Sequence, residues 1–249
     1  MSTNKDDDQE IVNSSKNVNF QLPTDRAYVW LIVGKPGSGK THCLKSIMLD
    51  YARKKHFKFG IVFTQNKMNS DLDFCPEKAV KEYNDEDCSK YIETLMKFRE
   101  ESKEKDQKLP PSFMIFEDCI GSKSMNLYSD RISKLLILHR HLNISIFFLS
   151  QYLGGRTGSS TLLRECTNFA LLFNTRFHNS KEFLYKACGG LFKKSEEFFD
   201  VLEKATSKPH RALFYDSSKD DINDAYFCFT APSDIPEFQL KFKKKPSLQ

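Results

Sequence analysis

Short apolar runs alternate with segments of helical spacing along most of the chain. Each run is bounded by polar or glycine-containing residues, a pattern typical of strands that are buried on both faces of a sheet. We expect these strands at residues 27–33, 58–64, 112–116, 144–149 and 169–173. Helical spacing predicts helices at about 40–55, 85–105, 128–139 and 180–204, the last broken at Gly189-Gly190. Strands that alternate with helices predict an α/β fold, in which a mostly parallel sheet is covered on both faces.

The two ends of the chain differ from this alternating region. Residues 1–20 are polar, and we expect them to form a disordered arm. Two late apolar runs, 211–215 and 225–229, are predicted to pair as a C-terminal β-hairpin. Residues 233–249 are predicted to be a basic tail that includes Lys243-Lys244-Lys245. The predicted organisation is therefore an arm, one domain over 21–232, and a tail.

Composition narrows the class of protein. No apolar run approaches the roughly 18 residues that span a bilayer, so we expect no membrane insertion. The N-terminal residues lack the apolar core of a signal peptide, so we do not expect secretion by that route. The seven cysteines are scattered without a Cys-x-x-Cys pair, which favours free thiols in a reducing compartment. The net charge of +5 permits a polyanionic partner without requiring one.

A glycine-rich loop follows the first predicted strand and precedes the first predicted helix. It reads Gly34-Lys35-Pro36-Gly37-Ser38-Gly39-Lys40-Thr41, a G-x-x-x-x-G-K-T pattern. Strand, loop and helix in this order are the context of a P-loop, whose backbone N–H groups hold phosphate oxygens. We expect Lys40 to reach the β- and γ-phosphates of a nucleoside triphosphate and the Thr41 hydroxyl to bind Mg²⁺. A chance glycine loop is the alternative to this interpretation.

The apolar strand predicted at 112–116 ends in two acids, Glu117 and Asp118. Parallel strands present their carboxyl ends at the edge of the sheet where the P-loop also lies. One acid at this position can hold Mg²⁺ through water, and the other can polarise a water molecule against the γ-phosphate. Chain order assigns Glu117 to the metal and Asp118 to the water, and the reverse assignment stays open.

Two polar side chains flank the strand predicted at 144–149. Gln151 follows it, where its amide can hydrogen-bond the γ-phosphate and the attacking water as a sensor; a simple strand cap is the alternative. Arg140 precedes it, about 20 Å from its own nucleotide at about 3.3 Å per residue. Arg140 can therefore act only on a neighbouring subunit, as an arginine finger in trans. A surface role for Arg140 stays open, and rival candidates are Arg156, Arg164 and Arg176.

Together these motifs resemble the poxvirus-type genome-packaging ATPases of the FtsK-HerA superfamily of DNA-translocating motors. The resemblance covers about residues 27–190, and the discriminating block is Arg140-His141-Leu142-Asn143-Ile144-Ser145-Ile146-Phe147-Phe148-Leu149-Ser150-Gln151. The family places its trans-acting arginine and its polar sensor where Arg140 and Gln151 lie. It usually has Asp first in the acid pair, so Glu117-Asp118 departs from the family pattern and leaves the division of roles open.

The resemblance implies a RecA-like P-loop NTPase that hydrolyses ATP with Mg²⁺. It implies a homomeric ring that threads double-stranded DNA into a preformed capsid, with a capsid or portal component as partner. It places the protein in the host cell at sites of virion assembly, in the cytoplasm or nucleus, and in association with the virion. Candidate DNA-contacting loops are Gly121–Asn126, with Lys123, and Tyr152–Ser160, with Arg156. Lys243–Lys245 could also hold DNA.

Two other functions are compatible with the same P-loop. One is an ATPase of the same fold that acts as a DNA helicase or recombination factor, although no segment is long enough to be a strand-separating domain. The other is a small-molecule kinase, although the arginines are dispersed rather than clustered as in a kinase lid. The histidines lack Cys or carboxylate partners at ligand spacing, so we expect no metal site built on them.

Overall fold

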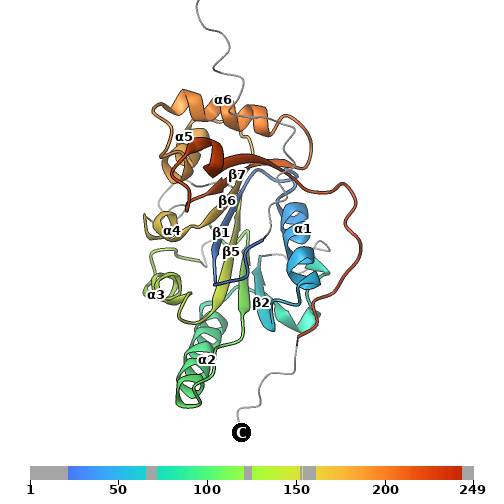
Figure 1. Cartoon of the computed structure of the whole chain (residues 1–249), viewed down its shortest axis with the longest axis vertical. Helices are drawn as coiled ribbons and strands as arrows, with labels where there is room; N and C mark the ends of the chain where they lie inside the picture. The colour runs from blue at the N-terminus through green and yellow to red at the C-terminus, as the bar shows by residue number, and fades with distance from the viewer. Residues whose placement is uncertain (1–21, 66–71, 121–124, 152, 154–160, 243–249) are drawn as a thin grey trace, which may run out of the picture.

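The computed structural model describes residues 22–65, 72–120, 125–151, 153 and 161–242. The strands in this part of the chain form one eight-stranded sheet with the order β3-β2-β4-β5-β1-β6-β7-β8 (Figure 1). The strands are β1 (Val29–Val33), β2 (Phe59–Thr64), β3 (Val80–Glu82), β4 (Ser112–Glu117), β5 (Ile144–Ser150), β6 (Phe169–Leu172), β7 (Arg211–Asp216) and β8 (Tyr226–Thr230). Neighbouring strands from β3 to β6 are parallel, whereas β7 is antiparallel to both β6 and β8.

Helices cover both faces of this sheet. They are α1 (Lys40–Arg53), α2 (Asp85–Glu104), α3 (Asp130–Leu138), α4 (Thr161–Cys166), α5 (His178–Cys188), α6 (Ser195–Ala205) and α7 (Ile222–Ala225), with a 3₁₀ turn, η2, at Glu77–Ala79. In Figure 1, α1 lies on one side of the sheet, and α2, α3 and α4 lie on the other. Side-chain caps explain where two of these helices begin. The side chains of Asn84 and Ser129 accept hydrogen bonds from backbone N–H groups in the first turns of α2 and α3.

The central strands are apolar on both faces because both faces are packed. In β4, Phe113 and Ile115 contribute to the core beneath α1, whereas Met114 and Phe116 contribute to the core beneath the helices of the opposite face. All six residues of β4 are buried. Alternation of side chains across the sheet therefore gives two hydrophobic cores, and a continuous apolar run is needed to fill both.

The fold predicted from the sequence is confirmed in its main features. The parallel strands lie where the apolar runs placed them, and the predicted C-terminal hairpin pairs as β7 and β8. The hairpin also extends the main sheet, because β7 pairs with β6. The predicted interruption near Gly189 separates α5 from α6. The sequence did not predict β3, α4 or α7, which are only three, six and four residues long.

The described part of the predicted tail, residues 233–242, packs along the α1 side of the sheet. The backbone N–H of Leu240 donates to the carbonyl oxygen of Phe74 over 2.8 Å. The ring of Phe238 stacks on Phe74, and the ring of Phe242 contacts Phe113. Residues 1–20 and Lys243–Lys245 lie outside the described residues. None of the helices in the described part combines the length and the apolar character that crossing a bilayer requires.

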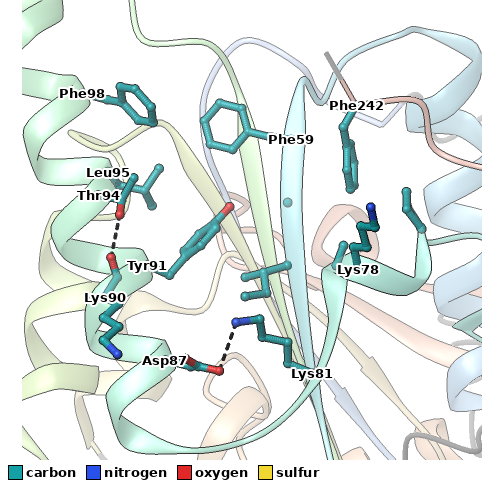
Figure 2. Close-up of a pocket in the computed structure, with 14 residues that line it drawn as sticks. Phe59, Lys78, Lys81, Asp87, Lys90, Tyr91, Thr94, Leu95, Phe98 and Phe242 are labelled. Carbon is teal, nitrogen blue, oxygen red and sulfur yellow. Dashed lines mark hydrogen bonds and ion pairs between the residues drawn. The ribbon is translucent and has the colours of Figure 1, made fainter. Parts of the chain in front are cut away.

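A cavity of about 620 Å³ lies between α2, the start of β2 and Phe242 (Figure 2). Phe59, Phe98 and Leu95 give it apolar walls, and Lys81 at its border forms an ion pair with Asp87 over 3.0 Å. Phe59, Gly60 and Ile61 begin β2, so the cavity lies along the amino-terminal half of this strand, and no P-loop residue lines it. The P-loop lies at the carboxyl ends of the parallel strands, and the cavity is therefore separate from it.

Candidate active site

The glycine-rich loop links β1 directly to α1, and its backbone conformation depends on glycine. Gly39 caps α1 with a φ of +98°, a left-handed conformation that residues with a Cβ rarely adopt. At Gly34 a Cβ would lie 2.5 Å from the Ser38 Oγ atom and 2.7 Å from the Phe173 Cβ atom, which leaves no room for a side chain. The loop can therefore turn tightly over the end of β1, as a P-loop requires.

The start of α1 is open to an anion. The first helical hydrogen bond joins the N–H of Cys43 to the carbonyl oxygen of Gly39. The N-cap residue, Gly39, has no side chain to cap the preceding N–H groups, and the first turn contains no acidic residue. The N–H groups of a first helical turn have no partner within the helix, and they carry the positive end of the helix dipole. The geometry suits a phosphate group at this position.

The side chain of Lys40 lies across the loop. Its side-chain Nζ atom donates to the carbonyl oxygen of Gly34 over 2.8 Å and to that of Lys35 over 3.4 Å. Burial lowers the pKa of the Lys40 ammonium, and the charges of Asp118 and Glu117 partly oppose this shift. The ammonium group is thus held between the loop carbonyls and the two acids, where it can contact phosphate oxygens.

Glu117 is the last residue of β4 and is buried. Its Oε1 atom accepts a hydrogen bond of 3.3 Å from the Thr41 hydroxyl, and its Oε2 atom accepts one of 2.8 Å from the Thr64 hydroxyl. Thr64 ends β2, the strand next to β4. These hard oxygen donors are the ligands that Mg²⁺ prefers, directly or through water, so the residues fit a magnesium site. The sequence analysis missed Thr64, although a polar residue at the end of an apolar strand was an available signal.

Asp118 and Gln151 meet at the carboxyl ends of β4 and β5. The Gln151 Nε2 atom donates to the Asp118 Oδ2 atom over 3.1 Å. Asp118 has a φ of +48°, and its N–H donates to the carbonyl oxygen of Leu149. The Asp118 Oδ1 atom is buried and has no hydrogen-bond partner among the described residues. The carboxylate is thus oriented by Gln151 through Oδ2, whereas Oδ1 is shielded from solvent.

The predicted arginine candidates lie in different environments. Arg140 is exposed in the turn between α3 and β5, at the opposite end of β5 from Gln151. Arg164 donates to the Lys186 carbonyl oxygen and to the Thr161 hydroxyl, both over 3.2 Å, which ties it to its own subunit. Arg176 is exposed just after β6. Arg156 and Lys123 lie outside the described residues. The structure therefore brings Lys40, Thr41, Glu117, Asp118 and Gln151 together and leaves Arg140 apart from them.

The histidines and cysteines form no metal site in the part of the chain that the structure describes. No cluster of three His, Cys, Asp or Glu side chains there could hold a metal ion. All seven cysteines are free, and burial raises the pKa of the Cys43 thiol to about 12. His139 is buried and donates from Nδ1 to the Leu136 carbonyl oxygen over 2.6 Å.

Two further histidines lie beside the P-loop, and the sequence analysis did not identify them as site residues. The rings of His42, in the first turn of α1, and His210, in the turn before β7, have centroids 4.6 Å apart. His210 also borders the loop itself, because its Nδ1 atom lies 3.4 Å from the position of a Cβ on Gly39. These two residues are far apart in the chain, so no local pattern could have paired them.

Comparison with known proteins places the fold among viral and conjugative ATPases. A model of the poxvirus A32 protein family matches residues 18–188. The genome packaging NTPase B204 of Sulfolobus turreted icosahedral virus 2, bound to ATPγS, is 16% identical with a TM-score of 0.56, and the match covers 80% of this chain and 96% of that one. The pCW3 conjugation coupling protein TcpA with ATPγS is 13% identical with a TM-score of 0.56, over 86% of this chain and 61% of that one.

A second B204 structure supports the same assignment of the fold. It is described as the DNA-packaging ATPase of Sulfolobus turreted icosahedral virus, and it is 14% identical with a TM-score of 0.53, over 77% of this chain and 93% of that one. No curated protein matches the sequence significantly. At these identities the likeness establishes a shared P-loop NTPase fold, and the predicted fold class is confirmed.

Proposed function

The chain belongs to the poxvirus A32 protein family, and from this premise we propose that it is an ATP-driven motor that translocates double-stranded DNA into a capsid. The observation that carries the proposal is the meeting of Lys40, Thr41, Glu117, Asp118 and Gln151 around one P-loop. Structural relatives that carry ATP analogues are described as a genome packaging NTPase and a conjugation coupling protein, which supports ATP as substrate and DNA as the translocated polymer.

The loop and the first turn of α1 bind the phosphates of ATP through backbone N–H groups, and Lys40 lies against the β- and γ-phosphates. Thr41 and Glu117 would hold Mg²⁺, with Glu117 acting through water. When bound, Mg²⁺ neutralises charge on the phosphate oxygens. The hydrogen bond from Thr64 to Oε2 holds the Glu117 carboxylate in the orientation in which Oε1 faces Thr41.

Hydrolysis requires a water molecule in line with the γ-phosphate. Asp118 accepts a hydrogen bond from this water, and Gln151, whose amide donates to Asp118, orients the water and the γ-phosphate. The Asp118 Oδ2 atom is already bound to Gln151, which couples the positions of the two groups. This division of roles follows chain order, with Glu117 serving the metal and Asp118 serving the water.

The site is completed by a second copy of the chain. Arg140 lies at the amino end of β5 and is exposed, so it cannot reach the P-loop of its own subunit. In a homomeric ring it reaches the γ-phosphate of the neighbour and stabilises the charge that develops during transfer. Hydrolysis at each interface then moves DNA, which is held through its phosphates without sequence preference. We propose a capsid or portal component as a further partner and the virion assembly site of the host cell as the location.

A phosphate-release assay tests this function. The assembled protein is incubated with ATP and Mg²⁺, with duplex DNA, single-stranded DNA or no DNA. We expect duplex DNA to raise the rate above both other conditions, because the hydrolysing interface is coupled to the bound duplex. The Lys40→Ala variant, which loses the phosphate contact, is the background control. A rate that duplex DNA leaves unchanged in the assembled protein would argue strongly against a motor, and a rate stimulated only by single strands would favour a helicase.

A further inference from the structure

The sheet differs chemically on the two sides of β1, the strand that leads into the P-loop. In the sheet, β5 and β4 lie on one side of β1, and β6, β7 and β8 lie on the other. Gln151, Glu117 and Asp118 all belong to the β5 and β4 side. If these residues activate water as proposed above, the γ-phosphate must lie on that side. The nucleoside, at the other end of the triphosphate, must then extend toward the carboxyl end of β6 and the turn before β7.

The imidazole ring of His210 lies on the β6 and β7 side of β1. His210 ends the turn between α6 and β7, is exposed, and lies against the last glycine of the loop, Gly39. The His42 ring, from the first turn of α1, lies beside the His210 ring with an interplanar angle of 43°. Together the two rings form a shelf next to the place where the helix N-terminus receives phosphate. We call this pair of side chains the histidine shelf.

Backbone contacts hold the histidine shelf in position. The His42 Nε2 atom lies 2.6 Å from the carbonyl oxygen of Pro232, and a carbonyl only accepts, so Nε2 carries the proton and donates. The N–H of Ala231 donates to the carbonyl oxygen of His210 over 3.1 Å. His210 has a φ of +58°, a left-handed conformation that is uncommon outside glycine and that occurs frequently at functional sites. The segment that follows β8 therefore holds the His42 ring and the backbone of His210.

An unpartnered acceptor lies at the same edge. Asn174 follows β6, and the register that pairs Leu172 with Leu213 brings the residues after β6 alongside the turn that contains His210. The Asn174 Oδ1 atom is buried and has no hydrogen-bond partner in the described part of the chain. A buried carbonyl-type oxygen without a donor is costly to maintain, so this edge of the sheet carries an unsatisfied polar group.

From this geometry we propose that the histidine shelf is the base subsite, where a purine stacks on His210. The proposal rests on the nucleotide-binding role given to the P-loop above. Stacking on an aromatic side chain depends on the area of the ring and tolerates any flat base, so the larger purine is preferred to a pyrimidine. His210 is thus a specificity-determining residue for the nucleoside triphosphate.

Calorimetry on the full chain with Mg²⁺ separates the base from the phosphates. The three probes are a non-hydrolysable ATP analogue, the matching CTP analogue, and inorganic tripolyphosphate, which lacks the nucleoside. We expect His210→Ala to raise the Kd of the ATP analogue by about tenfold, the order expected for one lost stacking contact. The Kd of tripolyphosphate should stay within about twofold, because the loop is unchanged. A CTP analogue should lose less affinity than the ATP analogue, so the purine preference should shrink.

Three variants control this measurement. His210→Phe keeps a flat ring and should bind the ATP analogue nearly as well as the wild type. His210→Gly removes the ring and accepts a φ of +58° without strain, so it reports on the ring even where the alanine variant is destabilised. His141→Ala removes an exposed histidine at the opposite edge of the sheet and should leave every Kd unchanged.

Two results would overturn the base subsite. Unchanged binding of the ATP analogue in both His210→Ala and His210→Gly would show that the base lies elsewhere. An equal loss of ATP analogue and tripolyphosphate would show that His210 supports the loop rather than the base. Different results would contradict the proposed phosphate site itself. The wild type would then bind neither the ATP analogue nor tripolyphosphate, or Lys40→Ala would bind both with wild-type affinity.

Discussion

The two edges of the parallel sheet hold their charged side chains in opposite ways. At the carboxyl-end edge, Glu117 accepts hydrogen bonds from Thr41 and Thr64, and Asp118 accepts one from Gln151. At the amino-end edge, Arg140 is exposed, and its side chain forms no hydrogen bond or ion pair with the other described residues. Groups that act on their own nucleotide are oriented within the subunit before substrate arrives. A group that acts on a neighbour must project into solvent until the ring forms.

Arg140→Ala is the change with the largest expected effect. If Arg140 is the trans-acting finger, its loss should lower the rate of ATP hydrolysis by about 10³–10⁵-fold in assembled protein. ATP binding should be nearly unchanged, because the P-loop is intact. Phosphate release measured with duplex DNA present gives the rate, and binding of a non-hydrolysable analogue gives the affinity.

A mixing experiment asks whether the arginine acts across the interface. Arg140→Ala subunits have an intact acid pair, and Asp118→Ala subunits have an intact Arg140, so a mixed ring contains some interfaces with both groups. We expect mixing to restore part of the activity that each variant lacks alone. Arg176→Ala is the matched control, since Arg176 is also exposed but lies at the carboxyl-end edge. If Arg176→Ala subunits restored activity when mixed with Asp118→Ala subunits, and Arg140→Ala subunits did not, Arg176 would be identified as the arginine finger instead.

Lys40→Ala tests the carboxyl-end edge directly. Removing the ammonium that contacts the transferring phosphate should slow hydrolysis by at least about 10²–10³-fold, the cost of losing one preorganised donor. Unlike Arg140→Ala, the variant should also bind nucleotide more weakly, because the contact is made within the subunit. Lys45→Ala, on the same helix but paired with Asp73 over 2.7 Å, is the control and should retain activity. Normal turnover in Lys40→Ala would rule out the P-loop assignment.

Thr64→Val tests whether orienting Glu117 contributes to activity. Valine has nearly the shape of threonine but cannot donate to the Glu117 Oε2 atom, which now accepts from Thr64 over 2.8 Å. We expect activity or Mg²⁺ affinity to fall by about 10–100-fold, as for other groups that orient a metal ligand. Thr167→Val is the matched control, because Thr167 is buried and donates to the Leu163 carbonyl oxygen away from the site. Equal losses in the two variants would point to stability rather than to Glu117.

The sequence predicted those parts of the molecule whose cause is local. Strands buried on both faces require continuous apolar runs, so β1, β2, β4, β5 and β6 could be recognised. The short edge strand β3 pairs only with β2 and carries Lys81 and Glu82, so it lacks such a run. The predicted site residues at the carboxyl ends of these strands lie together, because parallel strands end at one edge.

The remaining parts of the site depend on long-range pairing. Thr64 reaches Glu117 because β2 and β4 are neighbours in the sheet, although they are separated in the chain by α2. His210 meets Gly39 because β7 adds to β6 in antiparallel register and returns the preceding turn to the P-loop edge. Neither contact leaves a periodic signal in the sequence. Both follow only when the strand order and the register are known.

His139 gives the smallest expected effect, and it tests the amino-end edge without nucleotide. Burial lowers the pKa of His139 below its usual 6.5; the hydrogen bond to Leu136 opposes the shift, and the positive charges of Arg140, Arg26 and His141 add to it. The unfolded chain therefore binds more protons than the native chain once the pH falls below about 6.5. Stability should be unaffected by this group above that pH and should decrease as the pH drops through it.

The variant His139→Asn can keep a donor near the position of Nδ1 and removes the titration. Its melting temperature should fall less between about pH 7.5 and about pH 5.5 than that of the wild type, because asparagine takes up no proton. His56, whose pKa is also lowered by burial, remains in both proteins and supplies the common background. A pH dependence identical to that of the wild type would mean that His139 accepts a proton without cost. The expected cost of adding a buried charge beside Arg140 would then be absent, and the prediction would be wrong.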